Sequence, residues 1–340
     1  MIKSVGSQKQ LLNWLTLSLI LVLCIIIVGG LTRLTNSGLS ITHWELFKGI
    51  LPPLSQASWI DYYEQYKKIP QFELVNSDMD LSRFKIIFYW EYFHRMLARL
   101  IGVFFLIPLI YLHYTNKIEK KYIIPCYLIL ALIILQGIVG WYMVKSGLVD
   151  AITVSHYRLS LHLSIAFVII SSIFWLILNL KENNSVKFFV LSKKNISILF
   201  LLFLIFSQII LGAFVSGLDA GKIYQTWPLM GLKYFPDDSS MIDYVSYFNF
   251  NNHSLVQFYH RNLAYLITFY VLGFSFYIYL KKIKNLYRPL IILIFFLILQ
   301  VILGITTLTS GLNMFLASAH QITSVFLVFS TINLYYNYIK

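Results

Sequence analysis

The sequence is poor in charged residues, and this excludes an ordinary soluble domain. Only 12% of its 340 residues are Asp, Glu, Lys or Arg, and 58% are hydrophobic. Soluble globular proteins carry about 25% charged residues. The net charge of +13 therefore does not indicate nucleic-acid binding, because its cations lie in short segments between long apolar runs. We interpret that charge as a signal of membrane topology.

Cysteine is also scarce, and this argues against a disulfide-stabilised fold. The two cysteines, Cys24 and Cys126, both lie inside apolar runs, and neither has a partner in an outer segment. The ten residues Met1 to Gln10 are too short for a transit peptide, and the first apolar run is too long for a signal-peptide core. We expect this run to be a retained helix of a bacterial plasma (inner) membrane protein.

Long apolar runs are what the chain has in abundance. A transmembrane helix needs about 20 predominantly apolar residues. The sequence therefore predicts an all-α, multi-pass integral membrane protein with eight transmembrane helices. The predicted spans are 11–31, 86–112, 122–141, 157–179, 196–216, 256–280, 289–308 and 314–336.

Basic residues gather in the short segments that follow the second, fourth and sixth runs. Short basic loops face the cytoplasm, so we expect both termini to be cytoplasmic. The two long loops, 32–85 and 217–255, are then periplasmic. The basic residues include Lys117, Lys120, Lys121, Lys181, Lys187, Lys281, Lys282, Lys284 and Arg288.

The chain shows an internal repeat. The segment 135–140 resembles 299–304, and Ser-Gly-Leu at 146–148 recurs at 310–312 with the same offset. Each copy holds four predicted helices, an even number, so both copies enter the membrane in the same direction. This predicts two parallel four-helix-bundle repeats related by a pseudo-two-fold axis along the membrane normal. The expected divisions are 1–182, a cytoplasmic linker at 183–195, and 196–340.

Four histidines occupy matched places in this repeat. His94 is echoed by His260 and His162 by His320, each in the first two or three turns of its span, roughly 6–13 Å below the outer end. An imidazole inside a membrane is costly and usually functional. Two imidazoles on different helices of a bundle can hold a flat cofactor, and haem iron accepts axial histidine. The alternatives are four interhelical hydrogen bonds, or zinc, although zinc usually takes three or four ligands.

Glu91 distinguishes the first half from the second. It lies three residues before His94, on the same helix face, and Gln257 occupies the matching place before His260. Only the first half then has an ionisable group beside its cofactor, which indicates that the first half carries out the chemistry. The alternative is that Glu91 forms an ion pair with Arg95 or Arg99.

Arginines near the histidines are candidates for binding carboxylate groups of a cofactor. Arg95 and Arg261 directly follow His94 and His260, and Arg33 follows the first span. These three could reach haem propionates or anchor the helices at the membrane interface.

The chain resembles the haem A synthase family of cytochrome oxidase assembly. The resemblance covers nearly the whole length. Its strongest marks are Gly-Gly-Leu-Thr-Arg-Leu-Thr at 29–35 with Ser-Gly-Leu-Ser at 37–40, Glu-Tyr-Phe-His-Arg at 91–95, Trp-Pro-Leu-Met-Gly at 227–231, and the paired histidines. The branch without a cysteine pair in the first outer loop is the one it resembles, because no cysteine lies between residues 32 and 85.

The resemblance implies an oxidoreductase that converts the C8 methyl group of haem O to the formyl group of haem A. By motif, His94 and His162 would flank the substrate haem, with Glu91 as the acidic residue beside it. His260 and His320 would bind the iron of a haem b. All four histidines are thus expected to be axial iron ligands near the periplasmic side.

Partners and competing functions follow from the same interpretation. The expected partners are haem O, haem A and the lipid bilayer, with haem O synthase and cytochrome oxidase assembly proteins as candidate protein partners. A homo-oligomer is compatible with the sequence, and nucleic acid is not expected. The competing functions are a bis-histidine membrane cytochrome b that carries electrons from quinol, and a haem transporter or chaperone.

Overall fold

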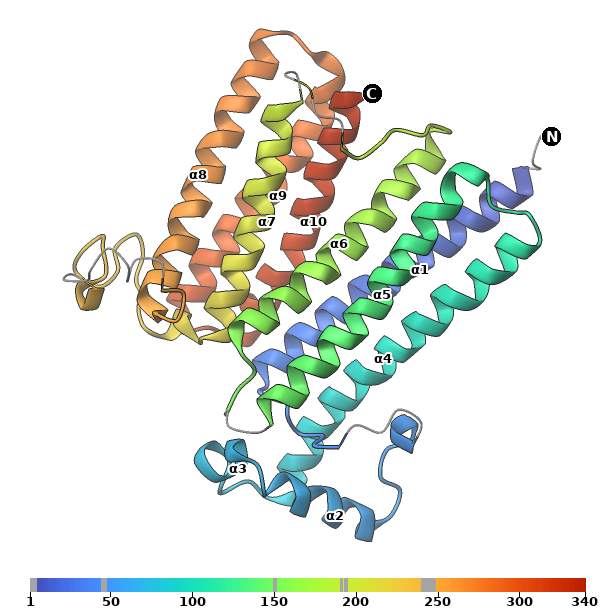
Figure 1. Ribbon diagram of the computed structural model, residues 1–340. Helices are drawn as coiled ribbons and strands as arrows, with labels where there is room; N and C mark the ends of the chain where they lie inside the picture. Colours follow the sequence, from blue (N-terminus) through green and yellow to red (C-terminus); the bar gives the residue numbers. More distant parts are fainter. Residues whose placement is uncertain (1–4, 44–47, 149–151, 190–191, 193–194, 240–248) are drawn as a thin grey trace. The chain divides into compact units, whose positions relative to one another are not determined.

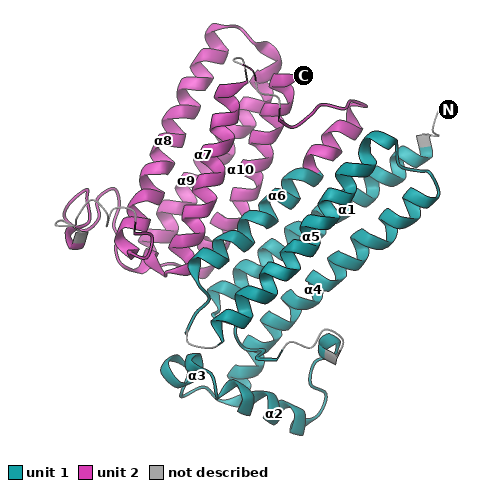
Figure 2. Cartoon of the chain, in the orientation of Figure 1, with its two compact units in different colours: residues 1–173 teal, residues 174–340 magenta. Residues whose placement is uncertain are grey.

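The computed structural model describes residues 5–43, 48–148, 152–189, 192, 195–239 and 249–340. Within these ranges the chain is helical, with no β-strand and one isolated bridge between Met230 and Lys233. The chain divides into two compact units, residues 1–173 (unit 1) and 174–340 (unit 2), and the boundary falls inside helix α6 (Figure 2). Residues 190, 191, 193 and 194 of the expected linker lie outside the described ranges.

Eight helices in the described part of the chain are long and apolar enough to span a membrane. This confirms the predicted number of spans. The helices extend a few residues beyond the predicted apolar runs, because polar residues continue them at their ends. They are α1 (Val5–Leu34), α4 (Leu81–Tyr114), α5 (Lys120–Gly147), α6 (His156–Lys181), α7 (Ile196–Gly217), α8 (His253–Leu280), α9 (Tyr287–Thr309) and α10 (Met314–Ile339) (Figure 1).

Short polar side chains fix where three of these helices begin. Asp80 accepts a hydrogen bond from the backbone N–H of Arg83 at the start of α4. Asn252 and Asn313 cap α8 and α10 in the same way. Such caps satisfy N–H groups that have no partner within the helix. These caps therefore determine where three of the four helices that carry the matched histidines begin.

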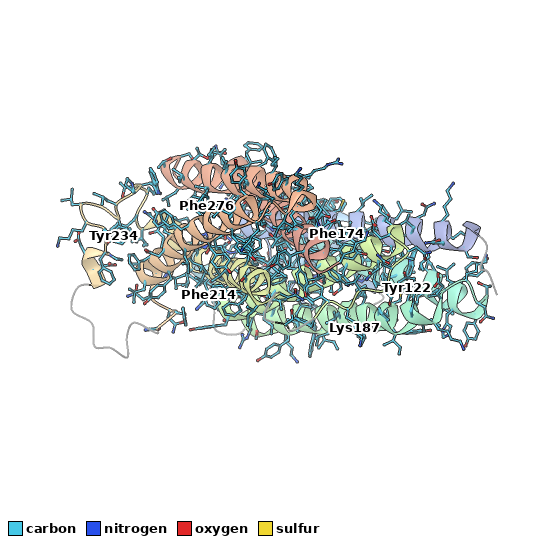
Figure 3. The ribbon with its side chains drawn as sticks, turned by 90° about the horizontal axis from the view of Figure 1, so that it is seen from above. Tyr122, Phe174, Lys187, Phe214, Tyr234 and Phe276 are labelled. Atoms are coloured by element: carbon cyan, nitrogen blue, oxygen red, sulfur yellow. The ribbon has the colours of Figure 1, made fainter. Side chains whose placement is uncertain are left out.

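Large apolar side chains cover the outward faces of the long helices. Phe269 of α8 is 72% exposed and Ile107 of α4 is 59% exposed. Phe276 of α8, labelled in Figure 3, is another exposed side chain of this kind. Lipid tails, unlike water, accommodate such surfaces, so the exposed faces fit a bundle that lies in a bilayer.

Helix packing differs between corresponding pairs. In unit 2, α9 packs closely against α10, whereas α5 and α6 are held farther apart. Ala317 lies about one helical turn before His320, whose ring packs against Gly304 of α9, and the corresponding residue of α6 is Leu159. Small residues let membrane helices approach closely, which accounts for the tighter pair.

The first outer loop contains structure that the sequence did not predict. Helices α2 (Gln56–Tyr66) and α3 (Pro70–Val75) lie between α1 and α4 in the chain. Trp59 and Tyr66 of α2 pack on Phe84 and Phe88 in the first turns of α4, in a core shared with Leu39 and Ile41. The loop after α1 is thereby held against the outer part of α4.

Candidate functional site

The two histidines of each unit face one another. In unit 1 the ring centres of His94 (α4) and His162 (α6) lie 6.5 Å apart. In unit 2 those of His260 (α8) and His320 (α10) are also 6.5 Å apart. Two imidazoles that bind one iron from opposite sides, through bonds of about 2 Å, hold their ring centres roughly 6 Å apart. Both pairs therefore have the separation that axial ligation of one haem iron requires.

Glycines of neighbouring helices make room for the imidazoles in unit 1. A Cβ atom at Gly29 of α1 would lie 3.0 Å from Cε1 of His94. At Gly140 of α5 it would lie 2.9 Å from Cε1 of His162. Carbon atoms pack at about 3.5–4.0 Å, so a larger residue at either place would push the ring away.

Unit 2 repeats this arrangement. A Cβ atom at Gly212 of α7 would lie 3.2 Å from Cε1 of His260, and one at Gly304 of α9 would lie 3.0 Å from Cε1 of His320. Our sequence reasoning did not connect these four glycines with the histidines. The available signal was a glycine near the outer end of every helix that precedes a histidine-bearing helix.

Glutamine side chains tie the histidine-bearing helices to their neighbours. Gln136, four residues before Gly140, donates a hydrogen bond of 3.0 Å from Nε2 to the backbone oxygen of His162. Gln208, four residues before Gly212, donates one of 2.9 Å to the backbone oxygen of His260. Each amide joins two helices at the level of a histidine. These glutamines also escaped the sequence reasoning.

His320 and His94, the other two matched histidines, differ in the contact that the neighbouring helix offers them. Nε2 of Gln300 lies 3.3 Å from Nε2 of His320, and the backbone oxygen of Gln300 lies 3.1 Å from Nδ1 of that ring. Ile25 of α1 takes the corresponding place, four residues before Gly29. Among the described residues, His94 is thus the one matched histidine whose neighbouring helix offers no amide.

Hydrogen bonds within the protein do not satisfy the ring nitrogens of all four matched histidines. Nδ1 of His94, His162 and His260 is buried without a hydrogen-bond partner in the described parts of the chain. A buried polar nitrogen without a partner is costly. An interhelical contact therefore satisfies a ring nitrogen of His320, and Nε2 of Gln208 lies 3.4 Å from a ring nitrogen of His260. In the described parts of the chain, hydrogen bonding does not explain why the rings of His94 and His162 are buried. No cluster of three or more metal-binding side chains occurs among the described residues, so the donor set is a pair of imidazoles.

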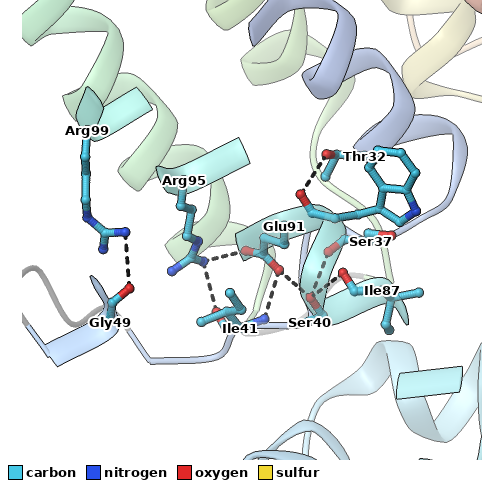
Figure 4. A network of polar contacts seen from close by, with 10 residues as sticks. Thr32, Ser37, Ser40, Ile41, Gly49, Ile87, Glu91, Arg95 and Arg99 are labelled. Atoms are coloured by element: carbon cyan, nitrogen blue, oxygen red, sulfur yellow. Dashed lines mark hydrogen bonds and ion pairs between the residues drawn. The ribbon is translucent and has the colours of Figure 1, made fainter. Parts of the chain in front are cut away.

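Glu91, three residues before His94 on α4, lies at the centre of a polar network (Figure 4). The residue as a whole is 2% exposed. Oε2 accepts hydrogen bonds from the hydroxyl of Ser40 at 2.7 Å and from the backbone N–H of Ile41 at 2.8 Å. Oε1 forms an ion pair with Arg95, whose Nη2 also donates to the backbone oxygen of Ile41 at 3.0 Å. The pair with Arg95 is the one that we considered as the alternative role of Glu91, and it is present.

Ser40 and Ile41 are site residues that sequence reasoning missed. The hydroxyl of Ser40 lies 3.0 Å from the backbone oxygen of Ser37 and 3.2 Å from that of Ile87, so it sits between the loop and α4. The signal was present, because Ser37 and Ser40 belong to the motif that follows α1. Its connection to Glu91, 51 residues away, depends on tertiary packing.

The corresponding residues of unit 2 form a different network. Nε2 of Gln257 donates to the backbone oxygen of Tyr224 at 2.9 Å, and Nη2 of Arg261 donates to the same oxygen at 2.9 Å. Nη1 of Arg261 donates to the backbone oxygens of Thr226 and Leu229 at 2.8 and 3.3 Å. Both units therefore use the arginine after the histidine to hold an outer loop, but the carboxylate is found in unit 1.

Arg33 and Arg99 each donate a hydrogen bond to a residue of the segment that follows α1. Arg33 is four residues after Gly29, on the same face of α1, and Nη1 donates to Oδ1 of Asn36 at 3.0 Å. Nη1 of Arg99 donates to the backbone oxygen of Gly49 at 3.3 Å. The position of Arg33 is compatible with its predicted role as a propionate ligand.

An open hollow of about 540 Å³ lies along α4, at the level of His94. Trp90 and Leu97, four residues before and three after His94, contribute to its wall. The full lining is Val28, Trp90, Phe93, Met96, Leu97 and Leu100. The predominantly apolar wall suits a large, flat, apolar ligand.

Comparison with known proteins agrees with this geometry. Residues 12–332 match the model of a family described as cytochrome oxidase assembly protein. The haem A synthase of Pelagibacter ubique is 46% identical over 330 residues, which cover 95% of this chain and 94% of the relative. Those of Flavobacterium psychrophilum and Rickettsia bellii are 38% and 39% identical, over 96% and 94% of the chain and 97% and 96% of the relatives. The chain therefore belongs to the haem A synthase family of cytochrome oxidase assembly proteins.

Proposed function

We propose that this protein converts haem O to haem A by oxidising the methyl group at porphyrin C8 to a formyl group. The family resemblance implies successive hydroxylations of that carbon and loss of water from the gem-diol, a net four-electron oxidation whose electrons pass to an external acceptor. The observation that carries the proposal is the His94–His162 pair, whose ring centres lie 6.5 Å apart beside a buried carboxylate. The similarity to relatives named haem A synthase supports it over nearly the whole chain.

In this proposal, unit 1 binds the substrate. His94 and His162 hold the haem O iron from opposite sides, and Gly29 and Gly140 keep both imidazoles in place. The open hollow along α4 offers a predominantly apolar surface for the macrocycle. Fixing the macrocycle in this way places one edge of the substrate in a constant position relative to the protein.

Glu91 is proposed as the catalytic carboxylate. Ser40, Ile41 and Arg95 hold its two oxygens, so the side chain has little freedom to rotate. Held beside the substrate, the carboxylate can stabilise positive charge that develops on the porphyrin edge, or accept a proton from it.

Unit 2 is proposed to hold a haem b between His260 and His320. The ring separation and the unpartnered Nδ1 of His260 are compatible with this group. Bound there, haem b would supply one-electron redox chemistry. Arg33, Arg95 and Arg261 are proposed to bind or orient propionates of the two haems, in addition to their contacts with the outer loops.

The functional halves are proposed to follow whole helices. Residues 1–182 form the catalytic half, 183–195 the cytoplasmic linker and 196–340 the haem b half, related by a pseudo-two-fold axis along the membrane normal. The matched histidine, glycine and glutamine positions support this duplication. We propose that the protein lies in the bacterial inner membrane with both termini in the cytoplasm and the haem sites near the periplasmic side.

Haem O synthase and oxidase assembly proteins are proposed as partners, because haem O must be supplied and haem A must be transferred to the oxidase. A homo-oligomer is compatible with the large apolar faces of the helices.

An electron-carrying cytochrome b is the second candidate, because unit 2 carries a histidine pair with Gln257 in the place that Glu91 has in unit 1. A haem transporter or chaperone is the third.

Extraction and chromatography of the bound haems distinguish these functions. The protein is purified from cells with and without a supply of haem O. The proposal predicts haem b together with haem O or haem A when haem O is supplied. Haem b alone would indicate the electron carrier, and haem O that is never converted would indicate a transporter or chaperone. A purified protein that binds no haem would overturn the proposal.

A further inference from the structure

The positive charge of Arg95 is balanced within unit 1. Its guanidinium lies against Glu91, and the exposed fractions of the two side chains are 11% and 3%. The pair is buried and carries no net charge. Because both residues flank His94, the ligand pair of unit 1 is next to an electrically neutral group.

The charge of Arg261 is not balanced in this way. Its hydrogen bonds end on three carbonyl oxygens, and its Nε is buried without a partner among the described residues. Gln257 stands where Glu91 stands in unit 1, and it is neutral. The three carbonyls belong to Tyr224, Thr226 and Leu229.

Acidic residues of the same outer segment are engaged elsewhere. The carboxylate of Asp238 accepts hydrogen bonds from the hydroxyls of Ser254 at 2.6 Å and Tyr224 at 3.1 Å. Asp237 forms an ion pair with Lys233 at 3.1 Å. Within the described ranges, no acidic side chain forms an ion pair with Arg261. The cation that follows His260 is therefore not paired with an acidic side chain, whereas the cation that follows His94 is.

Such a charge affects the reduction of a neighbouring haem. Reduction adds an electron to the iron, so a nearby positive charge stabilises the reduced form. The effect is larger away from water, where the dielectric constant is low. Burial and hydrogen bonding around the group are established means by which proteins tune haem potentials.

We propose that Gln257 and Arg261 raise the reduction potential of the haem bound by His260 and His320, whereas the neutral Glu91–Arg95 pair has no such effect in unit 1. The inference rests on the proposed function, because it requires a haem at the pair in unit 2. Arg261 is thus a potential-setting residue rather than a catalytic one. A propionate that it binds belongs to the haem itself, so the charge that the protein contributes at this place remains that of the arginine. The neutral Gln257 is as important as the arginine, since a carboxylate there would cancel its charge.

A spectroscopic redox titration tests the proposal. The protein is purified from cells without haem O, so that the resident haem b is the group observed. Gln257→Glu copies the pair of unit 1, and Gln257→Met is the control that removes the hydrogen bond to Tyr224 without adding charge. The midpoint potential should become more negative in Gln257→Glu, by up to about tenfold in the reduction equilibrium, or 59 mV for one electron. It should stay near the wild-type value in Gln257→Met.

Equal shifts in both variants, or no shift in Gln257→Glu, would overturn the inference. If Gln257→Glu does not retain haem, Arg261→Gln is measured instead. It removes the charge and keeps an amide donor for the loop carbonyls, and the same negative shift is expected. His260→Ala distinguishes this result from failure of the proposed function: a haem b spectrum unchanged in that variant would refute haem b binding in unit 2. A spectrum that is lost in His260→Ala, with a potential insensitive to both charge variants, refutes this inference alone.

Discussion

Each matched imidazole fits because the facing residue of the neighbouring helix is a glycine, which has no Cβ atom. His94 and His162 were predicted as a pair from the sequence, because buried histidines at repeated positions are hard to explain otherwise. The glycines that receive them were not predicted, because a glycine in a membrane helix has several common roles. Only the contact itself, 2.9 Å from a Cβ at Gly140 to His162, shows the role of that glycine.

Gly140→Ala should displace the His162 ring and weaken haem binding in unit 1. The added methyl group is too close to Cε1, and overpacking of this kind costs about 1–3 kcal/mol. We expect several-fold less haem O retained per protein, measured by pigment extraction after supply of haem O. Gly137→Ala, on the same helix, is the matched control, because nothing lies within 4 Å of a Cβ at that place. Equal haem retention in the two variants would contradict the role of Gly140.

Glu91→Gln should abolish formation of haem A and leave haem binding intact. The amide keeps the shape of the side chain but cannot accept a proton or balance the charge of Arg95. The product is measured by chromatography of extracted haems, and binding by the absorbance of the purified protein. Ser40→Ala is a milder test, because it removes one hydrogen bond to Oε2 and leaves the carboxylate. Full activity in Glu91→Gln would remove Glu91 from the mechanism, and loss of bound haem would indicate a structural role.

At the scale of helices, the spans could be predicted but the contacts between them could not. Apolar runs determine which segments enter a bilayer, whereas close approach depends on which small residues face each other. Helix α2 was not predicted, because its few aromatic residues are explained only by packing on Phe84 and Phe88 of α4. The link between Ser40 and Glu91 escaped prediction for the same reason. Hydrophobic periodicity reports burial and does not identify the partner.

Ala317→Leu should force α9 and α10 apart and destabilise unit 2. The substitution introduces the residue that α6 carries at Leu159 into a more closely packed pair of helices. We expect a loss of about 1–3 kcal/mol, seen as a lower Tm when release of haem b is followed during heating. Phe315→Leu is the control, since that side chain is 79% exposed and such changes usually stay within about 0.5 kcal/mol. An unchanged Tm in Ala317→Leu would show that the pair tolerates a wider separation.

For the whole molecule, the distribution of charge predicts an orientation in the membrane that can be tested in living cells. The basic segments after α4, α6 and α8 predict that these face the cytoplasm. The two native cysteines lie within α1 and α5, where the bilayer protects them from a membrane-impermeant thiol reagent. The wild-type protein therefore provides an unlabelled background. A cysteine introduced into a basic segment or into a long loop then reports which side of the membrane that part of the chain faces.

Leu232→Cys and Ser185→Cys make this test specific. Leu232 lies in the segment between α7 and α8 and is 90% exposed, and Ser185 is an exposed residue of the segment after α6. In intact cells the reagent should label Leu232→Cys and should label Ser185→Cys only after the membrane is opened. The reverse pattern would place the histidine-bearing ends of the helices on the cytoplasmic side, because His94, His162, His260 and His320 all lie toward the ends that face the long loops. The proposed supply and removal of haem would then have to occur from the opposite face of the membrane.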